Sequence, residues 1–203
     1  MLPRSVRLKF TKTGSLQFIS HLDLNRTMKT VMIRAKIPIH YTEGFNPHPK
    51  MVFALPLSIG AESVCELLDI KVDKELCDDE IVRRLNLSLP SEMRVLEAYT
   101  PETKFTDIRY AEYEICSEEP MDVSPLSSDS IIVMKRTKSG TKESDIRPLI
   151  KSWNRTDSGL SCVLSADSAD YLNPEYIASL FHLKDYCIMR RKVLLADGIT
   201  EFR

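Results

Sequence analysis

The segment from Glu43 to Lys50, EGFNPHPK, combines side chains that can do chemistry with residues that fix the backbone. The imidazole of His48 can act as a base or a ligand, the ammonium of Lys50 can hold an anion, and the ring of Phe45 can stack on a nucleobase. Prolines on both sides of His48 keep its backbone extended, which lowers the entropic cost of presenting its side chain. The segment lies between two apolar runs, so we interpret it as a loop that carries a site.

The same segment also has a purely structural interpretation. In that case the prolines only set the register of a turn, and His48 forms a hydrogen bond with a neighbouring carbonyl. An aromatic residue at the end of a strand, such as Phe45, more often belongs to the core than to a binding surface. The binding interpretation therefore requires that both rings reach solvent.

A metal site is a second possibility for these polar residues. Imidazole and carboxylate groups suit zinc, iron or manganese, and the candidates are His21, Asp23, His40 and His48. His21 and Asp23 also fit the first turn of a helix capped by Ser20, which needs no metal. The five cysteines are scattered singly without a C-x-x-C pair, which predicts reduced, mostly buried thiols and no local zinc knuckle or iron–sulfur cluster. No metal or other cofactor is therefore expected.

The charge of the chain is unevenly distributed, although the whole sequence carries only −1. Residues 1–60 contain nine basic and two acidic side chains, whereas residues 61–130 contain seven basic and eighteen acidic ones. Such asymmetry suggests that the first segment faces a polyanion or an acidic partner; the alternative is a set of solvated faces whose charges meet on folding. We also expect the start of the first helix to bind an anion through its unpaired N–H groups.

Hydrophobic periodicity predicts the order β-α-β-β-α-β in residues 1–100, which is the ferredoxin-like arrangement. Ser20 and Asp23 mark the start of the first helix, Lys36 lies at its end, and Pro38 follows. The predicted elements are a strand or hairpin over 6–19, a helix over 20–36, strand pieces over 39–42 and 51–57, a strand over 65–72, a helix over 78–89 and a strand over 93–99.

Residues 101–203 predict a second, less regular α+β domain, with strands over 110–116, 131–137, 160–165 and 185–196 and helical turns over 144–153 and from 173 onward. The predicted fold class is therefore α+β, as two tandem ferredoxin-like (βαββαβ) halves with antiparallel sheets. A basic loop around Gly140 is either a solvated turn or a contact to a nucleic-acid backbone. Its basic residues are Lys135, Arg136, Lys138 and Lys142.

The sequence narrows the location and the function class. It begins without a signal peptide and has no apolar run of about 20 residues, so we expect a cytoplasmic protein without a membrane contact. It also lacks the sequence motifs of P-loop nucleotide hydrolases, dinucleotide-binding enzymes, serine hydrolases of the G-x-S-x-G type and H-E-x-x-H zinc proteases. These absences favour a binding module over an enzyme.

Four motifs resemble a bacterial family called radical SAM-linked or radical SAM-associated proteins. They are HLDLNR at 21–26, EGFNPHPK at 43–50, FALPLSIG at 53–60 and KRTKSGTKESDIRPLI at 135–150. The resemblance implies a domain of undefined activity that occurs alone or fused to a radical S-adenosylmethionine enzyme. The chain lacks the C-x-x-x-C-x-x-C cluster motif, so it resembles the stand-alone form, with a radical SAM enzyme as partner. The family is usually associated with ribosome and RNA-processing functions, and this association implies RNA as the substrate class.

Together these patterns predict an RNA-binding accessory module that presents RNA to a radical SAM enzyme through a basic first helix and the GFNPHPK loop. One alternative is a protein-interaction subunit of that enzyme that never contacts RNA. Another is an RNA-processing or modifying enzyme in which His48 is the general base. The residues predicted to contact RNA or phosphate are Arg26, Lys29, Lys36, Phe45, Asn46, His48 and Lys50.

Overall fold

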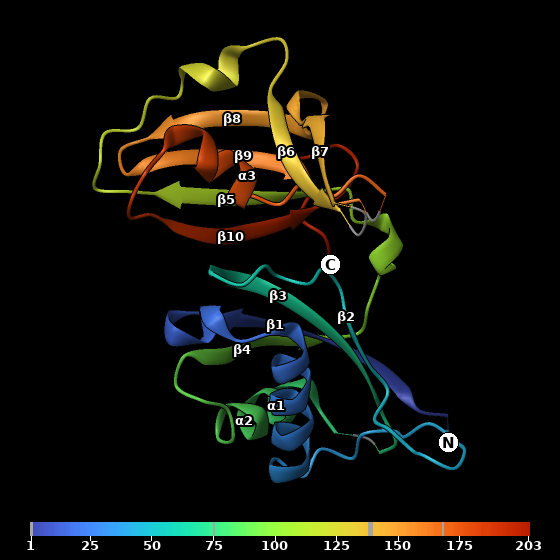
Figure 1. Cartoon of the computed structure of the whole chain (residues 1–203). Coiled ribbons are helices and arrows are strands. Elements are labelled where there is room, and N and C mark those ends of the chain that lie inside the picture. Colours follow the sequence, from blue (N-terminus) through green and yellow to red (C-terminus); the bar gives the residue numbers. More distant parts are fainter. Residues whose placement is uncertain (1, 75, 138–139, 168) are drawn as a thin grey trace. The chain divides into compact units, whose positions relative to one another are not determined.

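The computed structural model describes residues 2–74, 76–137, 140–167 and 169–203 (Figure 1). The chain forms two compact units, residues 1–105 together with Arg203 and residues 106–202. In each unit, antiparallel strands outnumber the helices. The predicted α+β class with antiparallel sheets is therefore confirmed.

The first unit has the element order predicted for it. Its strands lie in the order β4-β1-β3-β2, and each neighbouring pair is antiparallel. The elements are β1 (Arg4–Lys12), η1 (Gly14–Phe18, a 3-10 helix), α1 (His21–Arg34), β2 (Met51–Phe53), β3 (Ala61–Val72), α2 (Asp78–Asn86) and β4 (Met93–Tyr99).

Both helices of the first unit cover the same face of its sheet (Figure 1). The apolar stripe of α1 is buried at Leu24, Met28, Val31 and Met32. The shorter helix α2 buries Ile81 and Leu85. These side chains form one core with alternate residues of the strands, among them Val6, Leu8, Phe10, Leu68 and Ile70. Burial of this apolar area stabilises the helices more than their intrinsic propensity does.

Two predictions for the first unit are corrected. Residues 14–18 form a 3-10 helix and not the second strand of a hairpin, because Gly14 has φ +60° and Glu92 accepts hydrogen bonds from the backbone and side chain of Ser15. The second strand is also much shorter than predicted. Only Met51–Phe53 is a strand, and the earlier piece is reduced to isolated bridges at Ile39 and Tyr41. Prolines before and after these residues have no N–H to donate to a ladder.

The second unit contains a sheet in the order β10-β5-β9-β8 and a separate ribbon, β6-β7. All neighbouring strands are antiparallel. The strands are β5 (Tyr110–Cys116), β6 (Ile132–Thr137), β7 (Gly140–Asp145), β8 (Ile150–Thr156), β9 (Gly159–Ser165) and β10 (Cys187–Leu194). The helical elements are α3 (Glu175–Ala178) and the 3-10 helices η2 (Phe105–Asp107, which begins in the first unit), η3 (Ser124–Ser127), η4 (Arg147–Leu149) and η5 (Ser179–Phe181).

The helical turn predicted over 144–153 is confirmed only for three residues, whose first N–H donates to the Asp145 carboxylate. This stretch contains the end of β7, the three-residue helix η4 and then most of β8. Pro148 occupies the start of η4, and from Ile150 the chain pairs with β9. The β8–β9 turn depends on Gly159, because a Cβ at this position would lie 2.1 Å from the carbonyl oxygen of Ile115. The connection between β5 and β8 contains η3, the β6-β7 ribbon and η4.

A buried ion pair holds the strands of the first unit together. Arg7 on β1 and Asp69 on β3 are cross-strand partners, with Nε–Oδ1 and Nη2–Oδ2 distances of 2.7 and 2.8 Å. The side chain of Arg7 is 1% exposed, whereas that of Asp69 is 27% exposed. The guanidinium also donates to the carbonyl of Thr103 at 3.0 Å and lies 4.3 Å from the centroid of the Phe105 ring. The pair therefore fixes the chain after β4 as well as the β1–β3 register.

We expect Asp69→Asn to destabilise the first unit by about 3 kcal/mol, because it leaves a buried guanidinium without its counter-charge. Urea unfolding checks this when it is followed by helical circular dichroism, which reports mainly α1 and α2. Fluorescence of Trp153, the single tryptophan, reports the second unit in the same experiment. The matched control is Asp78→Asn, which breaks a half-exposed pair with Arg4 and should cost less than about 1 kcal/mol. Equal losses for both variants would contradict the role of burial.

A second prediction concerns the pH dependence of α2. Hydrogen bonds from Arg83 and Arg84 lower the pKa of Glu80 from its usual 4.5 to about 2. A carboxylate with a lowered pKa stabilises the fold above pH 4.5, and this contribution is lost as the pH falls towards 2. The urea midpoint of Glu80→Gln should therefore lie below that of the parent chain at pH 7, and the difference should narrow below pH 4.5. A difference that does not change with pH would contradict this prediction.

Candidate functional site

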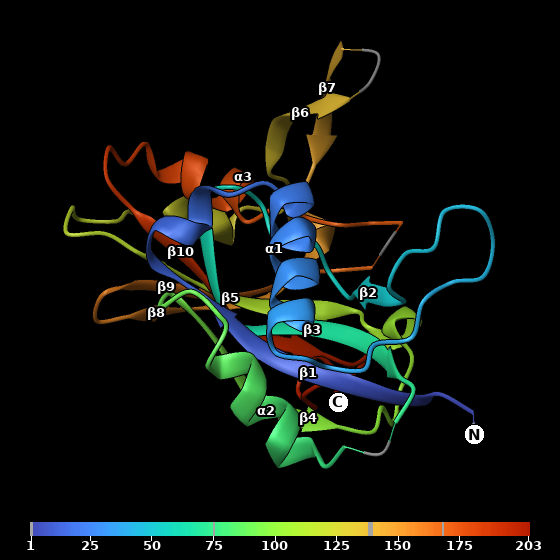
Figure 2. The same ribbon diagram turned by 90° about the horizontal axis from the view of Figure 1, so that it is seen from below.

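The segment after α1 forms an exposed loop that extends away from the helix (Figure 2). An isolated bridge joins Tyr41 to Pro49, and the N–H of Thr42 donates to the carbonyl of His48 at 2.9 Å. The ring of Phe45 at the tip has a relative exposure of 112% and so has no place in the core. Asn46 and Lys50 are exposed as well.

The backbone and one ring nitrogen of His48 contact Thr42, and the side chain is exposed to solvent. Its backbone N–H donates to the hydroxyl oxygen of Thr42 at 3.1 Å, and its ring Nδ1 lies 3.1 Å from the same oxygen. Nδ1 also lies 3.3 Å from the carbonyl oxygen of Asn46. Among the described residues, Nε2 has no hydrogen-bond partner. The threonine hydroxyl thus orients the imidazole while one ring nitrogen faces solvent.

The outer face of α1 and the residue two places after its end carry the cations that the sequence singled out. Arg26 is 3.3 Å from Asp23, and both side chains are more than half exposed, so this pair is weak. Lys29 and Lys36 form no side-chain hydrogen bond or ion pair with any residue that the structure describes. The same is true of Arg34, which the sequence reasoning missed. Its position eight residues after Arg26, on the same half of the helix, was the available signal.

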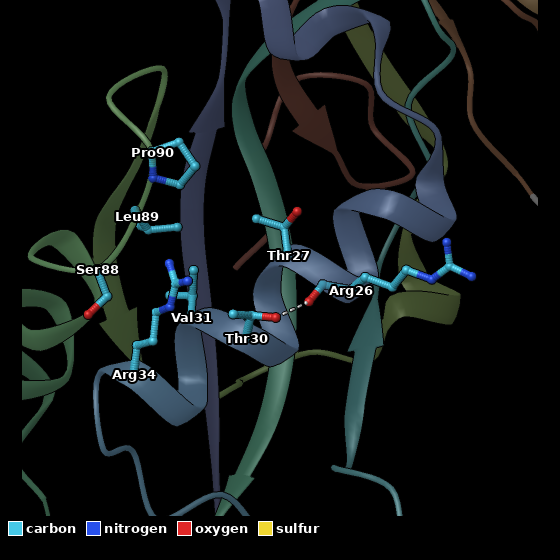
Figure 3. A pocket seen from close by; sticks show the side chains of 8 residues that line it. All are labelled: Arg26, Thr27, Thr30, Val31, Arg34, Ser88, Leu89 and Pro90. Carbon is cyan, nitrogen blue, oxygen red and sulfur yellow. Dashed lines mark hydrogen bonds between the residues drawn. The ribbon is translucent and has the colours of Figure 1, made fainter.

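Arg34 lines a groove of about 450 Å³ beside α1 (Figure 3). Its side chain points along the groove towards Val31 and Leu89, whereas the side chain of Arg26 points away from it (Figure 3). The full lining is Arg26, Thr27, Thr30, Val31, Arg34, Ser88, Leu89 and Pro90. A guanidinium beside hydroxyl groups suits an anionic oxygen ligand, because both can donate hydrogen bonds to it.

The anion site expected at the start of α1 stays a prediction, and the chain places one of its own carboxylates there. The hydroxyl oxygen of Ser20 accepts from the N–H of Asp23 at 3.1 Å, and the Asp23 carboxylate lies 2.7 Å from the same hydroxyl. The hydrogen bond from Ser20 is the main reason that the pKa of Asp23 is lowered. The negative charge favoured by the helix start is therefore supplied by the chain itself.

The four metal-site candidates have separate partners. The ring of His21 lies edge-on to Phe53 at 5.1 Å, and Nδ1 of His40 is 2.6 Å from Asp73. Asp23 belongs to the helix cap, and His48 is bound to Thr42. Among residues 2–74, 76–137, 140–167 and 169–203, no three His, Cys, Asp or Glu side chains are close enough to hold a metal ion.

The basic loop of the second unit is only partly described. Lys135 on β6 lies directly opposite Lys142 on β7. Like charges at opposed positions destabilise a ribbon, so this pair favours an anionic neighbour. Lys138 and the side chain of Arg136 lie outside the described residues.

These features define an α+β protein with an exposed aromatic loop and unpaired cations in its first unit. The chain belongs to the family described as "Uncharacterized protein conserved in bacteria (DUF2344)", whose sequence profile matches residues 5–174. A comparison with curated proteins gave no match. In the part of the chain that the structure describes, no helix is long and apolar enough to span a membrane.

We expect Thr42→Val to loosen the loop without unfolding the protein. The substitution keeps the side-chain shape but removes the hydroxyl that binds both the backbone and the ring of His48. Hydrogen exchange of residues 42–48 should become faster by roughly fivefold to tenfold, while the urea midpoint stays unchanged. As a control, Thr30→Val removes a hydroxyl bonded to the carbonyl of Arg26 on α1 and should leave loop exchange unaltered. Unchanged exchange in Thr42→Val would show that the prolines and the backbone hydrogen bond from Thr42 to His48 hold the loop without the hydroxyl.

Proposed function

We propose that this protein is an RNA-binding accessory module that acts with a radical SAM enzyme. In this proposal, cations of the first unit hold the phosphate backbone, and the GFNPHPK loop addresses unstacked bases. The observation that carries the proposal is the full exposure of Phe45 in the same unit as four cations that have no ion pair among the described residues.

The cations support binding to a polyanion. Lys29, Arg34, Lys36 and Lys50 have no ion pair among the described residues, so their charges are not neutralised within the fold. Contacts between such side chains and phosphates release counterions from the nucleic acid and give sequence-independent affinity. The groove beside Arg34 also offers the hydroxyls of Thr27 and Ser88 as donors to the same oxygen atoms, whereas that of Thr30 already donates to the carbonyl of Arg26.

The loop supports recognition of single-stranded bases. Single-stranded RNA exposes base faces that stack on aromatic rings, at about 1 to 3 kcal/mol for each base. Phe45 presents such a ring, and the exposed imidazole of His48 and the amide of Asn46 supply polar groups three residues or fewer away. Double-stranded RNA keeps its bases stacked and would make fewer contacts with this loop.

The proposal of a radical SAM partner rests on the sequence motifs and not on the geometry of the site. The motif HLDLNR forms the start of α1, and EGFNPHPK is the exposed loop. Both motifs therefore lie in the unit to which we assign RNA binding. The chain would hold the substrate while the partner performs the chemistry.

We also propose that the two units are versions of one ferredoxin-like plan. In each sheet the strands follow the order fourth, first, third, second, when the β6-β7 ribbon of the second unit is left out of the count. The second unit would then have a ribbon in place of the first crossover helix.

A protein-docking function is the second candidate, and exposed apolar residues favour it. Leu22 and Ile33 are 59% and 66% exposed, and both lie on the outer face of α1 with Arg26 and Lys29 between them. Exposed apolar groups next to charges are common in protein interfaces. In this alternative the radical SAM enzyme covers α1, and RNA is not contacted.

Titration of single-stranded and duplex RNA at two salt concentrations tests the first proposal. We expect tighter binding of the single strand and a steep loss of affinity between about 50 and 200 mM salt.

Arg34→Glu should lower the affinity for RNA at least about tenfold and reduce the slope of affinity against salt concentration. Phe45→Ala should weaken binding by about 1 to 3 kcal/mol with an unchanged salt slope. Asp23→Asn should tighten binding slightly, because it removes the carboxylate beside Arg26.

The matched control is Arg94→Glu, which reverses an exposed charge on β4 of the same unit. A loss of affinity equal to that of Arg34→Glu would indicate attraction by net charge only. Absence of binding at low salt would contradict the RNA proposal. If Leu22→Asp and Ile33→Asp then abolish co-purification with a radical SAM enzyme, the docking function is supported instead.

A further inference from the structure

Two cysteines lie directly opposite each other at one end of the second unit's sheet. Cys116 ends β5, Cys187 begins β10, and the two are Cα partners in the antiparallel register. Opposed residues in such a pair have Cα atoms about 4.5 to 5.5 Å apart, and a disulfide requires about 4.4 to 6.8 Å. Their neighbours Ile115 and Ile188 are buried, so alternation places both thiols on the other face of these strands.

The chain around the two thiols is already joined by hydrogen bonds. The hydroxyl of Ser117 donates to the carbonyl of Asp185 at 2.7 Å. The carboxylate of Glu119 accepts from the N–H groups of Lys184 and Asp185 at 3.1 and 3.4 Å. These hydrogen bonds join the chain that follows β5 to the chain that precedes β10, next to the cysteine pair.

A pocket of about 520 Å³ gives small molecules access to the pair. Its lining is Cys116, Ser117, Glu118, Glu119, Ser158, Asp185, Tyr186 and Cys187. The sulfur of Cys116 lies 3.6 Å from the hydroxyl oxygen of Ser158. Three carboxylates in this lining make the pocket acidic, which favours cationic over anionic reagents.

We propose that Cys116 and Cys187 form a redox-active dithiol that exchanges with small disulfides and reacts faster with cationic than with anionic ones. The thiolate of one cysteine attacks a sulfur of the reagent, the reagent's S–S bond breaks, and one thiol leaves. The other thiolate then attacks the mixed disulfide, and the second thiol leaves. The protein loses two hydrogen atoms, the reagent gains two, and β5 becomes linked covalently to β10.

The other cysteines provide internal controls. Cys65 and Cys162 are buried, and burial raises the pKa of the Cys162 thiol to about 12, which makes it a poor nucleophile. Cys77 is exposed but lies in the first unit, without an opposed cysteine. All five cysteines lie in the described part of the chain, and the prediction that they are mostly buried is wrong for Cys77 and Cys187.

Oxidation of the full chain with cystamine tests the proposal. Peptide mapping should find Cys116 joined to Cys187, and dithiothreitol should reverse the reaction. The thermal midpoint should rise by about 5 °C or more, because the link closes a long loop. Glutathione disulfide, which is anionic, should react at least about threefold more slowly at low salt, and the ratio should approach one at high salt.

Cys77→Ser should leave this disulfide intact, whereas Cys116→Ser should abolish it and leave a mixed disulfide on Cys187. Binding of phenylarsine oxide, which bridges two neighbouring thiols, should follow the same pattern in the unoxidised protein. The proposal is overturned if the parent chain yields only separate mixed disulfides at Cys116 and Cys187. It is also overturned if both thiols remain unmodified while Cys77 reacts.

Discussion

The absence of N–H donors at the prolines between α1 and β3 is the constraint on which the candidate site depends. Pro38, Pro47, Pro49 and Pro56 cannot donate to a ladder, so the second strand of the unit is limited to Met51–Phe53. The residues before it project as a loop and not as an extension of the sheet. At Thr42 and Lys50, the backbone N–H groups donate to the carbonyls of His48 and His40 at the base of the loop.

The rest of the first unit anchors this loop at both ends. The core of α1, α2 and the sheet holds both ends of the loop segment, and the Arg7–Asp69 pair fixes the register of β1 against β3. The loop base hydrogen-bonds to β3, where the N–H of His40 donates to the carbonyl of Lys71 at 2.7 Å. In the proposed function, an aromatic ring on such a support would lose little conformational freedom on binding a base.

Local patterns predicted much of the first unit. Hydrophobic alternation located β1, β3 and β4, and Ser20 with Asp23 located the start of α1, because each depends on neighbours in the sequence. The alternation of Leu16 and Phe18 was misleading, since contacts from distant Glu92 favour a 3-10 helix there. In the second unit β8 was mistaken for helical turns because its pairing with β9 is decided by tertiary contacts.

The site was predictable to the extent that it lies in one continuous segment. The exposure of Phe45 and His48 follows from the prolines and glycine around them. The groove at Arg34 was not predictable, since three of its eight lining residues come from Ser88–Pro90, which folding brings beside α1. The opposed pair Cys116 and Cys187 depends on strand register across seventy residues, and single-sequence patterns do not specify such a register.

Ultraviolet cross-linking of bound single-stranded RNA, followed by mass spectrometry of the peptides, tests the central claim most directly. The account predicts cross-links in the peptide that contains Phe45 and His48, lost on addition of excess unlabelled RNA. Cross-links confined to the second unit, or none under conditions where binding is measured, would contradict the assignment of this loop as the base-binding element.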